Sequence, residues 1–472
     1  MSAGRGIRRA VALVVLALIA LPGQPAGAGM DEREIGRRFL LEARGELPLI
    51  EDPAVKEYVE RVGRRLVKTL GSQSFDYSFY VVQDPSLNAF AVPGGYVFVF
   101  SGLLARVKND DELAGVLGHE IGHAAAHHIV RQQAEGQVAS AASLLGLLLS
   151  AVNPVLGAGA IAAAQTAQLK YSREFEQEAD YLGLRYATEA GFDPHALGSF
   201  FKELLAEQRL NPAGVPPYML SHPMTETRVA NIETIITTEK LKTPSGRPAA
   251  GPDLAEAQAI ARAIVESPDV ALARYRKLAD EKPNDAEAQF LLGRVYQQLG
   301  RLDAARTALE RSRELGGLGD RVDRPLGSVY TALKQTDKAH EVLDRYLTKH
   351  PDDGWVHLEL GKAIAERDEA AALVEYRRAI HLDPDLDEAH RLAGLALGRK
   401  GDEADGFYEL AIAARLRGEL EQSLSHFQRT EALLPRGSAR DVEVRKAIEE
   451  LLPIVRERER ARLERRRRTG LR

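Results

Sequence analysis

The sequence predicts a chain of two parts: an α+β domain, mostly helical with one small sheet, and then an all-α solenoid. Between Asp52 and His128, helical periodicity alternates with short stretches rich in aromatic and β-branched residues. Beyond a Pro/Gly-rich linker at 242–253, alanine, leucine and arginine dominate, and small residues recur with a constant period. A chain of 472 residues is also too long for one hydrophobic core.

The overall composition excludes several kinds of site. The chain has no cysteine, which excludes disulfides, thiolate metal sites, cysteine nucleophiles and a lipid anchor on an N-terminal cysteine. The formal net charge of −5 favours neither a nucleic acid nor a membrane surface as a partner. We therefore expect no nucleic-acid binding and at most peripheral contact with a membrane.

The first 28 residues have the pattern of an export signal. Three arginines precede an apolar run at 10–21, and the small residues 26–28 form a cleavage site. This pattern predicts cleavage near Ala28 and a mature chain in the periplasm of a Gram-negative cell. An uncleaved anchor is the alternative, although 10–21 is short beside the roughly 20 apolar residues of a membrane span.

A second apolar stretch covers 138–164 and is interrupted by Asn153 and Pro154. Neither half is long enough to span a bilayer. We interpret it as a helical hairpin that is buried or covers a groove. The alternative is a mobile apolar flap near a site or a membrane.

Local patterns predict the order of elements before the histidine-rich segment. Asp52 is placed to cap a helix that begins at Pro53. A strand is expected within 75–83, and a Pro-Gly-Gly turn separates a short strand from a second one at 96–100. Asn109 and Glu112 then fit a capping box for a helix with its body over 113–128, so the histidine cluster lies on a helix behind a small sheet.

The motif H-E-x-x-H at His119, Glu120 and His123 indicates a metal site. Residues four apart lie on one face of a helix, so both imidazoles can bind one zinc ion at about 2.0–2.1 Å. Glu120 is rotated about 100° from His119, so it flanks the ion, where it can act as a general base toward a zinc-activated water.

A catalytic zinc needs a third protein ligand. His127 and His128 are the nearest candidates, but on a continuous helix His127 lies about 12 Å along the axis from His119. One ion cannot reach both residues. We therefore expect His127 and His128 at the helix end or behind the metal ligands.

Acidic residues within 171–187 offer a better third ligand. Glu176 and Asp180 are four apart on an expected helix, which allows Glu176 to bind the metal while Asp180 orients a histidine ligand. Periodicity alone does not choose Glu176 over Glu174 or Glu178. The whole segment also fits a solvated acidic face.

The second half of the chain repeats. Gly293, Gly327 and Gly361 are 34 apart, and Gly394 follows after 33. This is the tetratricopeptide (TPR) pattern, with about five units over 254–436, and such arrays present a concave surface to peptides or protein segments. The charged segment 437–472 is expected to be a solvated helix that frays.

The motif H-E-x-x-H followed by "SREFEQEAD" resembles the zinc metallopeptidases typified by HtpX and the CAAX-prenyl peptidases. Aligning the Ser-Arg pair of that family places its Glu-x-x-x-Asp motif on Glu176 and Asp180. "NAFAVPGG" and "SHPMTETRVANI" are similar to soluble periplasmic members, and the resemblance covers roughly residues 33–240. The membrane-embedded relatives carry several spans, which this sequence lacks after its signal.

The resemblance implies a zincin-like metallopeptidase domain over 29–241 with one Zn²⁺ per chain. By role, it implies metal ligands His119, His123 and Glu176, catalytic Glu120 and Asp180, and His222 as a fourth ligand that holds the enzyme inactive. Arg228 and Asn88 are candidate contacts to substrate or to an anion, and Arg228 also fits a structural ion pair. The strand at 96–100 is a candidate edge strand for an extended substrate.

These features support two hypotheses of different classes. The first is a periplasmic zinc endopeptidase that cleaves misassembled outer-membrane or envelope proteins, while the TPR array binds clients or assembly machinery. The second is a chaperone or assembly adaptor that works through its TPR surface and carries a latent metal site. A purely structural zinc is a weaker third option.

Overall fold

The computed structural model describes residues 31–73, 75–134, 173–211, 215–243 and 251–468. The predicted export signal and the apolar stretch at 138–164 lie outside the described residues. The chain divides into two compact units, residues 1–265 and 266–472.

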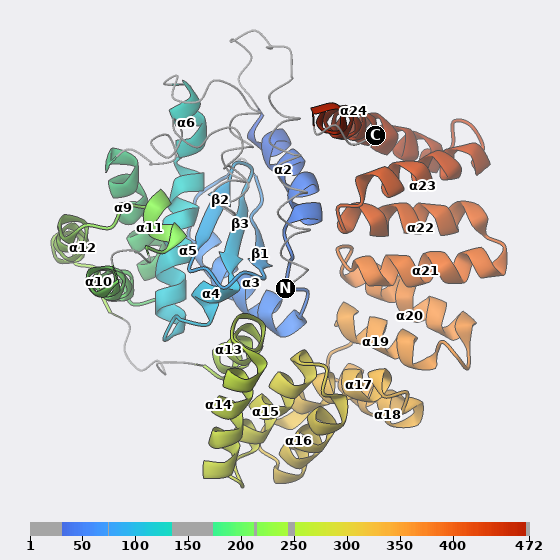
Figure 1. The fold of residues 1–472 in the computed structure, drawn as a ribbon, viewed down its shortest axis with the longest axis horizontal. Helices are drawn as coiled ribbons and strands as arrows, with labels where there is room; N and C mark the ends of the chain where they lie inside the picture. Colours follow the sequence, from blue (N-terminus) through green and yellow to red (C-terminus); the bar gives the residue numbers. More distant parts are fainter. Residues whose placement is uncertain (1–30, 74, 135–172, 212–214, 244–250, 469–472) are drawn as a thin grey trace. The chain divides into compact units, whose positions relative to one another are not determined.

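A three-stranded sheet forms the centre of the first unit (Figure 1). The strands are β1 (Ser78–Val82), β2 (Ala89–Val92) and β3 (Tyr96–Phe100). β1 runs parallel to β3, and β2 runs antiparallel to it through a turn whose glycines, Gly94 and Gly95, both have positive φ. The Pro-Gly-Gly turn and the strands around it are therefore as predicted.

The strand order corrects one expectation. The order is β1-β3-β2, so Tyr96–Phe100 is the central strand of the described sheet and β2 is an edge. The sequence alone predicted the edge role for Tyr96–Phe100. The difference arises because β1, which is distant in sequence, pairs in parallel with the side of β3 that β2 leaves open.

Alternating side chains of β3 bury the two faces of the sheet in separate clusters. Val97 and Val99 pack with the core that includes α3 (Pro53–Val67) and α5 (Asp110–Ala125). Phe98 and Phe100 face the opposite side, in the cluster that includes residues of α2 (Glu32–Glu46). A strand covered on both faces is rich in apolar residues throughout, as "YVFVF" is.

The helix starts follow their predicted caps. The Asp52 side chain accepts a hydrogen bond from Ala54 N, one residue into α3. The Asn109 side chain accepts from Glu112 N at 2.8 Å at the start of α5. These caps fix where both helices begin, and α5 then runs along β2 with the H-E-x-x-H motif on it.

The end of α5 differs from the prediction. The sequence predicted a helix body through His128, but α5 ends at Ala125 and a short helix, α6 (His128–Ala134), begins after a break. His127 occupies the break with a φ of 55°. A left-handed conformation is uncommon for a residue other than glycine and turns the chain out of the helix.

Two glycines let α5 and α9 (Arg173–Glu189) approach closely. A Cβ on Gly118 would lie 2.9 Å from the Gly183 carbonyl oxygen, and one on Gly122 would lie 2.9 Å from that of Ala179. Both distances are too short for a real side chain. Because the backbones touch, short side chains of α9 can reach the histidines of α5.

The remaining helices of the first unit flank this pair. They are α4 (Ser101–Leu104), α10 (His195–Leu210), α11 (Pro217–Ser221), α12 (Glu226–Thr238) and α13 (Pro252–Val265). The last of these packs against α3 and α4, and its Gln258 and Arg262 donate hydrogen bonds to backbone carbonyls at 104–107. The helix α13, which the sequence assigns to the repeat array, thus packs within the first unit, and the predicted boundary at 242–253 stays a prediction.

The second unit is a solenoid of helical hairpins (Figure 1). A Cβ on Gly293 would lie 2.7 Å from Leu309 Cγ, and one on Gly327 would lie 2.2 Å from Leu343 Cδ2. Glycine is required there because the two helices of each hairpin meet at that point, which explains the period in the sequence. The elements are α14 (Pro268–Glu281), α15 (Ala286–Gln298), α16 (Leu302–Leu315), η2 (Gly319–Val322), α17 (Asp323–Ala332), α18 (Thr336–Leu347), α19 (Gly354–Ile364), α20 (Glu369–Leu382), α21 (Asp387–Lys400), α22 (Glu403–Leu416), α23 (Leu420–Leu433) and α24 (Ala439–Arg468).

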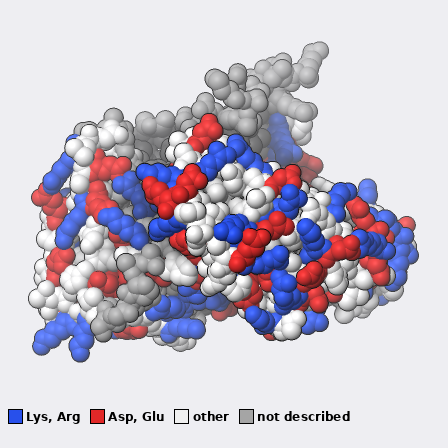
Figure 2. All heavy atoms as spheres, turned by 90° about the horizontal axis from the view of Figure 1, so that it is seen from below, with Lys and Arg blue, Asp and Glu red and all other residues white. Residues whose placement is uncertain are grey.

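Basic and acidic side chains are interspersed over the face of the molecule that Figure 2 shows. Exposed ion pairs, such as those of Arg209 with Glu226 and of Lys334 with Glu366, bring basic and acidic side chains together on the surface. Among the described helices, none combines the length and the apolar character that crossing a bilayer requires.

Candidate metal centre

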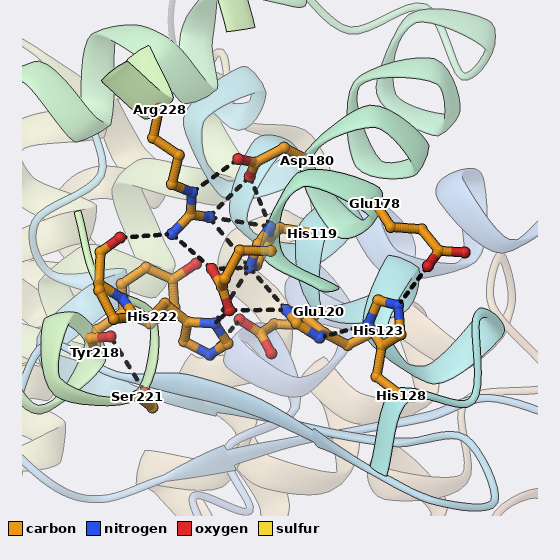
Figure 3. A network of polar contacts seen from close by, with 12 residues as sticks. His119, Glu120, His123, His128, Glu178, Asp180, Tyr218, Ser221, His222 and Arg228 are labelled. Carbon is orange, nitrogen blue, oxygen red and sulfur yellow. Dashed lines mark hydrogen bonds and ion pairs between the residues drawn. The ribbon is translucent and has the colours of Figure 1, made fainter. Parts of the chain in front are cut away.

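Four buried side chains converge on one point in the first unit (Figure 3). His119 and His123 come from α5, Glu176 from α9, and His222 directly follows α11. One donor atom from each lies within 4.8 Å of all the others. Two groups far apart in the sequence therefore meet the H-E-x-x-H motif, as the sequence predicted for Glu176 and His222.

The distances show how closely the donors gather. The Nε2 atoms of His119 and His123 are 3.1 Å apart, and Glu176 Oε1 lies 3.4 Å from His123 Nε2. His222 Nδ1 lies 2.9 Å from Glu176 Oε1 and 3.2 Å from His119 Nε2. Two imidazoles and a carboxylate are the donor types that zinc accepts in catalytic sites.

The neighbouring glutamates of α9 point elsewhere. Glu174 is exposed, and Glu178 contacts His128, outside the donor group. Glu176 is buried, 4% exposed, and is the acidic residue of α9 whose carboxylate lies among the donor nitrogens. The structure thus separates three candidates that helical periodicity left equivalent.

The ionisation states of two donors suit a metal ion. Burial alone would raise the pKa of Glu176, but the charges of His222 and Arg228 outweigh it and hold that pKa well below its usual range. Burial lowers the pKa of His123, so its imidazole stays neutral. A carboxylate and a neutral imidazole are the forms that bind metals.

Asp180 orients His119 from behind. Its Oδ1 lies 2.9 Å from His119 Nδ1, which leaves Nε2 facing the donor group. Arg228 holds the same carboxylate through Nε, at 2.7 Å from Oδ2, and through Nη2, at 2.8 Å from Oδ1. Burial would raise the pKa of Asp180, but Arg228 outweighs it and keeps the group ionised.

Glu120 lies beside the donor group. Its side chain is 1% exposed, and Oε1 has no hydrogen-bond partner within the described part of the chain. His222 Nε2 lies 3.5 Å from that oxygen. Burial raises the pKa of Glu120 even though the charges of His222 and His119 oppose the rise.

Comparisons with known proteins agree with this geometry. Residues 53–236 match the model of peptidase family M48, and residues 253–316 and 320–363 match tetratricopeptide repeat models. This chain carries an M48 peptidase domain and TPR repeats.

Several curated relatives of the M48 domain are proteases by name. The beta-barrel assembly-enhancing protease of Escherichia coli is 31% identical over 220 residues, which cover 44% of this chain and 45% of that protein. A Vibrio cholerae protein provisionally given the same name is 32% identical over 326 residues, covering 67% of this chain and 60% of that one. The mitochondrial metalloendopeptidase OMA1 of Schizosaccharomyces pombe is 35% identical over 182 residues, covering 37% and 51%. The chain thus spans from less than half to about three fifths of the length of these relatives.

A comparison with solved structures found a likeness to part of this chain. The crystal structure of MamA is 20% identical, covers 34% of this chain and 95% of that one, and has a TM-score of 0.30.

The two remaining predicted residues, Arg228 and Asn88, are not among the four donors. Arg228 is 5% exposed and pairs with Asp180 and with Glu176, whose Oε2 is 2.6 Å from Nη1, so its geometry is that of a buried ion pair. Asn88 is buried immediately before β2, and its backbone carbonyl accepts a hydrogen bond from Phe100 N. The contacts of Arg228 favour a structural ion pair, whereas the Asn88 contact is made by its backbone and leaves the role of its side chain a prediction.

Sequence reasoning missed Tyr218 in the M48 domain. Its ring is fully buried, and its hydroxyl makes no hydrogen bond of regular geometry within the described residues. Burial, with a contribution from the charge of Glu120, raises the pKa of Tyr218 well above its usual value. The sequence signal that could have identified Tyr218 is its spacing of four residues from His222. On the turn of α11 this spacing brings the two rings to within 4.8 Å of each other.

Proposed function

We propose that this chain is a zinc-dependent endopeptidase of the periplasm that acts on misassembled or misfolded outer-membrane and envelope proteins. The observation that carries the proposal is the convergence of His119, His123 and Glu176 beside the buried carboxylate of Glu120. The names of the bacterial relatives connect those proteins with β-barrel assembly and so support the substrate class, while the export-signal pattern at the start of the chain supports the compartment. The TPR array would bind clients or the assembly machinery, since such repeats commonly bind protein segments.

His119, His123 and Glu176 would hold one zinc ion per chain. Zinc in such a site supplies Lewis acidity, which lowers the pKa of water and polarises a peptide carbonyl. Asp180 accepts the Nδ1 proton of His119 and so keeps the Nε2 lone pair directed at the donor group. Arg228 keeps Asp180 ionised for that task.

Glu120 would move the proton of the reaction. Its Oε1 takes a proton from the attacking water and then delivers it to the amide nitrogen that leaves. The raised pKa of Glu120 suits both steps, because a group titrating nearer neutrality accepts and donates a proton more evenly. The Tyr218 hydroxyl, which stays protonated, would donate a hydrogen bond to the oxyanion that develops on the carbonyl oxygen.

His222 would keep the enzyme inactive. Its Nδ1 lies with the three ligands in one donor group and approaches Glu176 to 2.9 Å, so its ring fills the position that water and substrate need. Burial would lower the pKa of His222, but Glu120 and Glu176 outweigh it and raise that pKa, so the ring would have to give up a proton before it could bind a metal. Activity then requires α11 to carry His222 away from the other donors.

The strand β2 would bind the substrate backbone. It is an edge of the described sheet, runs along α5, and borders a small cavity that also reaches His123. An extended peptide can add to such an edge through backbone hydrogen bonds. This places the role that the sequence suggested for 96–100 on Ala89–Val92.

Cleavage of an unfolded outer-membrane protein by the zinc-loaded chain tests the proposal. Glu120→Gln should retain zinc and lose turnover by about 10²–10⁴-fold, since only the general base is removed. Turnover at the wild-type rate by this variant would contradict the peptidase mechanism. Full support of envelope assembly by the Glu120→Gln chain, with loss only in variants of the TPR surface, would favour the adaptor hypothesis.

A further inference from the structure

The break between α5 and α6 changes what His128 can reach. On a continuous helix, residues five apart point about 140° away from each other, so His128 would face away from His123. The left-handed φ of His127 turns the chain so that the two rings lie 4.9 Å apart at 76°. His128 is fully buried, with an exposed fraction of 0%.

The contacts of His128 form a chain that begins at a metal ligand. His123 Nδ1 lies 2.9 Å from His128 Nδ1, and His128 Nε2 lies 3.1 Å from Glu178 Oε2 (Figure 3). Arg131 Nη1 donates to the same carboxylate at 2.9 Å. The chain leads from the donor group to a half-exposed ion pair on the other side of α9.

One arrangement of protons satisfies every contact in this chain. His123 must keep Nε2 free for the donor group, so its proton sits on Nδ1 and is donated to His128. His128 then accepts on Nδ1 and carries its own proton on Nε2, which it donates to Glu178.

The other metal-binding histidine has a parallel arrangement. His119 donates from Nδ1 to Asp180, and Arg228 pairs with that carboxylate. In both cases an imidazole is held through Nδ1 and the chain of contacts ends at a carboxylate of α9 paired with an arginine. Residues 176, 178 and 180 of α9 thus supply a metal ligand and the anchors for both histidines.

Packing fixes the His128 ring in this orientation. The Phe175 ring stacks on it with centroids 4.4 Å apart and planes 12° from parallel. The Arg131 guanidinium lies 4.6 Å from the centre of the same phenyl ring. The stack leaves the imidazole no room to turn without losing these contacts.

We propose that His128 is a positioning residue that holds the metal ligand His123 in place, with Glu178 as its anchor. The inference rests on the proposed function only in that His123 binds zinc. A residue that orients a ligand typically changes metal affinity or activity by about 10–100-fold when it is lost.

Zinc affinity of the full chain, measured by competition with a chromophoric chelator, tests the proposal. His128→Phe keeps an aromatic ring on Phe175 but removes the acceptor, and should weaken zinc binding by about 10–100-fold. His128→Asn keeps an acceptor oxygen near the position of Nδ1 and should recover most of that loss. Glu178→Ala, a change at a half-exposed residue, should weaken binding by several-fold on the same scale.

The matched control is His127→Asn. This removes the neighbouring imidazole, whose Nδ1 contacts Glu32, while asparagine tolerates the positive φ. It should bind zinc as tightly as the unmodified chain. The absorption spectrum of the Co²⁺-loaded protein should change in His128→Phe and stay unchanged in His127→Asn, because it reports the geometry of the ligands.

Equal zinc affinity in His128→Phe and the unmodified chain would overturn the inference and leave the proposed function standing. A second result would also overturn it: His128→Phe and His128→Asn lose zinc affinity equally, and Glu178→Ala binds zinc as tightly as the unmodified chain. That pattern would show that His128 acts only through packing and not through its hydrogen bonds. Failure of the unmodified chain to bind zinc would instead contradict the proposed function.

Discussion

The guanidinium of Arg228 pairs with the carboxylate of Asp180 through two hydrogen bonds, in a place where both side chains are nine-tenths or more buried. The pair stands directly behind His119, and Arg228 also reaches Glu176 at 2.6 Å. One cation therefore balances Glu176, a proposed metal ligand, and Asp180, which orients the second proposed ligand, His119. Buried carboxylates that lose such a partner are costly, because neither water nor another cation replaces it.

Arg228→Met should therefore destabilise the metal-free chain by about 3–5 kcal/mol, the usual cost of breaking a buried ion pair from one side. The measurement is denaturant unfolding of the first unit within the full chain, monitored by circular dichroism. The control is Arg209→Met, which removes an exposed ion pair with Glu226 and should cost no more than about 1 kcal/mol. Similar decreases in the free energy of unfolding in both variants would show that the buried pair contributes no more to stability than the exposed pair.

His222→Ala should raise peptidase activity, because it empties the position that His222 shares with the three ligands. The expected result is faster turnover of an unfolded substrate with zinc content unchanged, since His119, His123 and Glu176 remain. The measurement pairs a cleavage assay with metal analysis. A fall in turnover at full zinc content would show that His222 assists the reaction.

Much of the site follows from local sequence rules. The spacing of His119 and His123 and the cap at Asn109 concern residues within one helix, and the structure has them as the sequence predicted. Gly118 and Gly122 explain why α9 can approach that helix, although no local rule says which glutamate would meet the histidines. Helical geometry is local, whereas the choice among acidic residues depends on how two distant helices pack.

The helix break at His127 shows why the remaining geometry of the site could not be predicted from the sequence. The segment "HAAAHH" contains no glycine, proline or asparagine, so its sequence fits a continuous helix. The left-handed residue is contacted by Glu32, 95 positions earlier, and its ring lies against Phe75. The position of His128 depends on that break and was therefore visible only in three dimensions.

Tyr218→Phe should lower kcat without releasing zinc. If the buried hydroxyl donates to the developing oxyanion, its loss should reduce kcat by about 10²–10³-fold and leave KM nearly unchanged. Phenylalanine keeps the ring beside His222, so the packing of α11 is preserved. A variant with normal kcat would remove Tyr218 from the mechanism, and one with normal kcat but raised KM would assign it to substrate binding.

Tyr58 should make the first unit sensitive to alkaline pH. Its hydroxyl donates to Asp110 Oδ1 at 3.0 Å and joins α3 to the start of α5. Burial first, and then the charge of Asp110, raise the pKa of Tyr58 above its usual value. A raised folded-state pKa means that stability is fully present below the unfolded-state pKa of about 10 and is lost as the pH rises above it.

The free energy of unfolding should then fall by up to about 1.4 kcal/mol per pH unit above pH 10 for this one proton. Tyr58→Phe should lower stability at pH 7 by about 1 kcal/mol through loss of the hydrogen bond, and should make the alkaline decline shallower by this amount. Denaturant unfolding at pH 8, 10 and 11 measures both effects. Parallel curves for the two proteins would show that the pH dependence of the unfolding free energy between pH 8 and 11 does not come from Tyr58, because a buried phenol that titrates only on unfolding must change the slope.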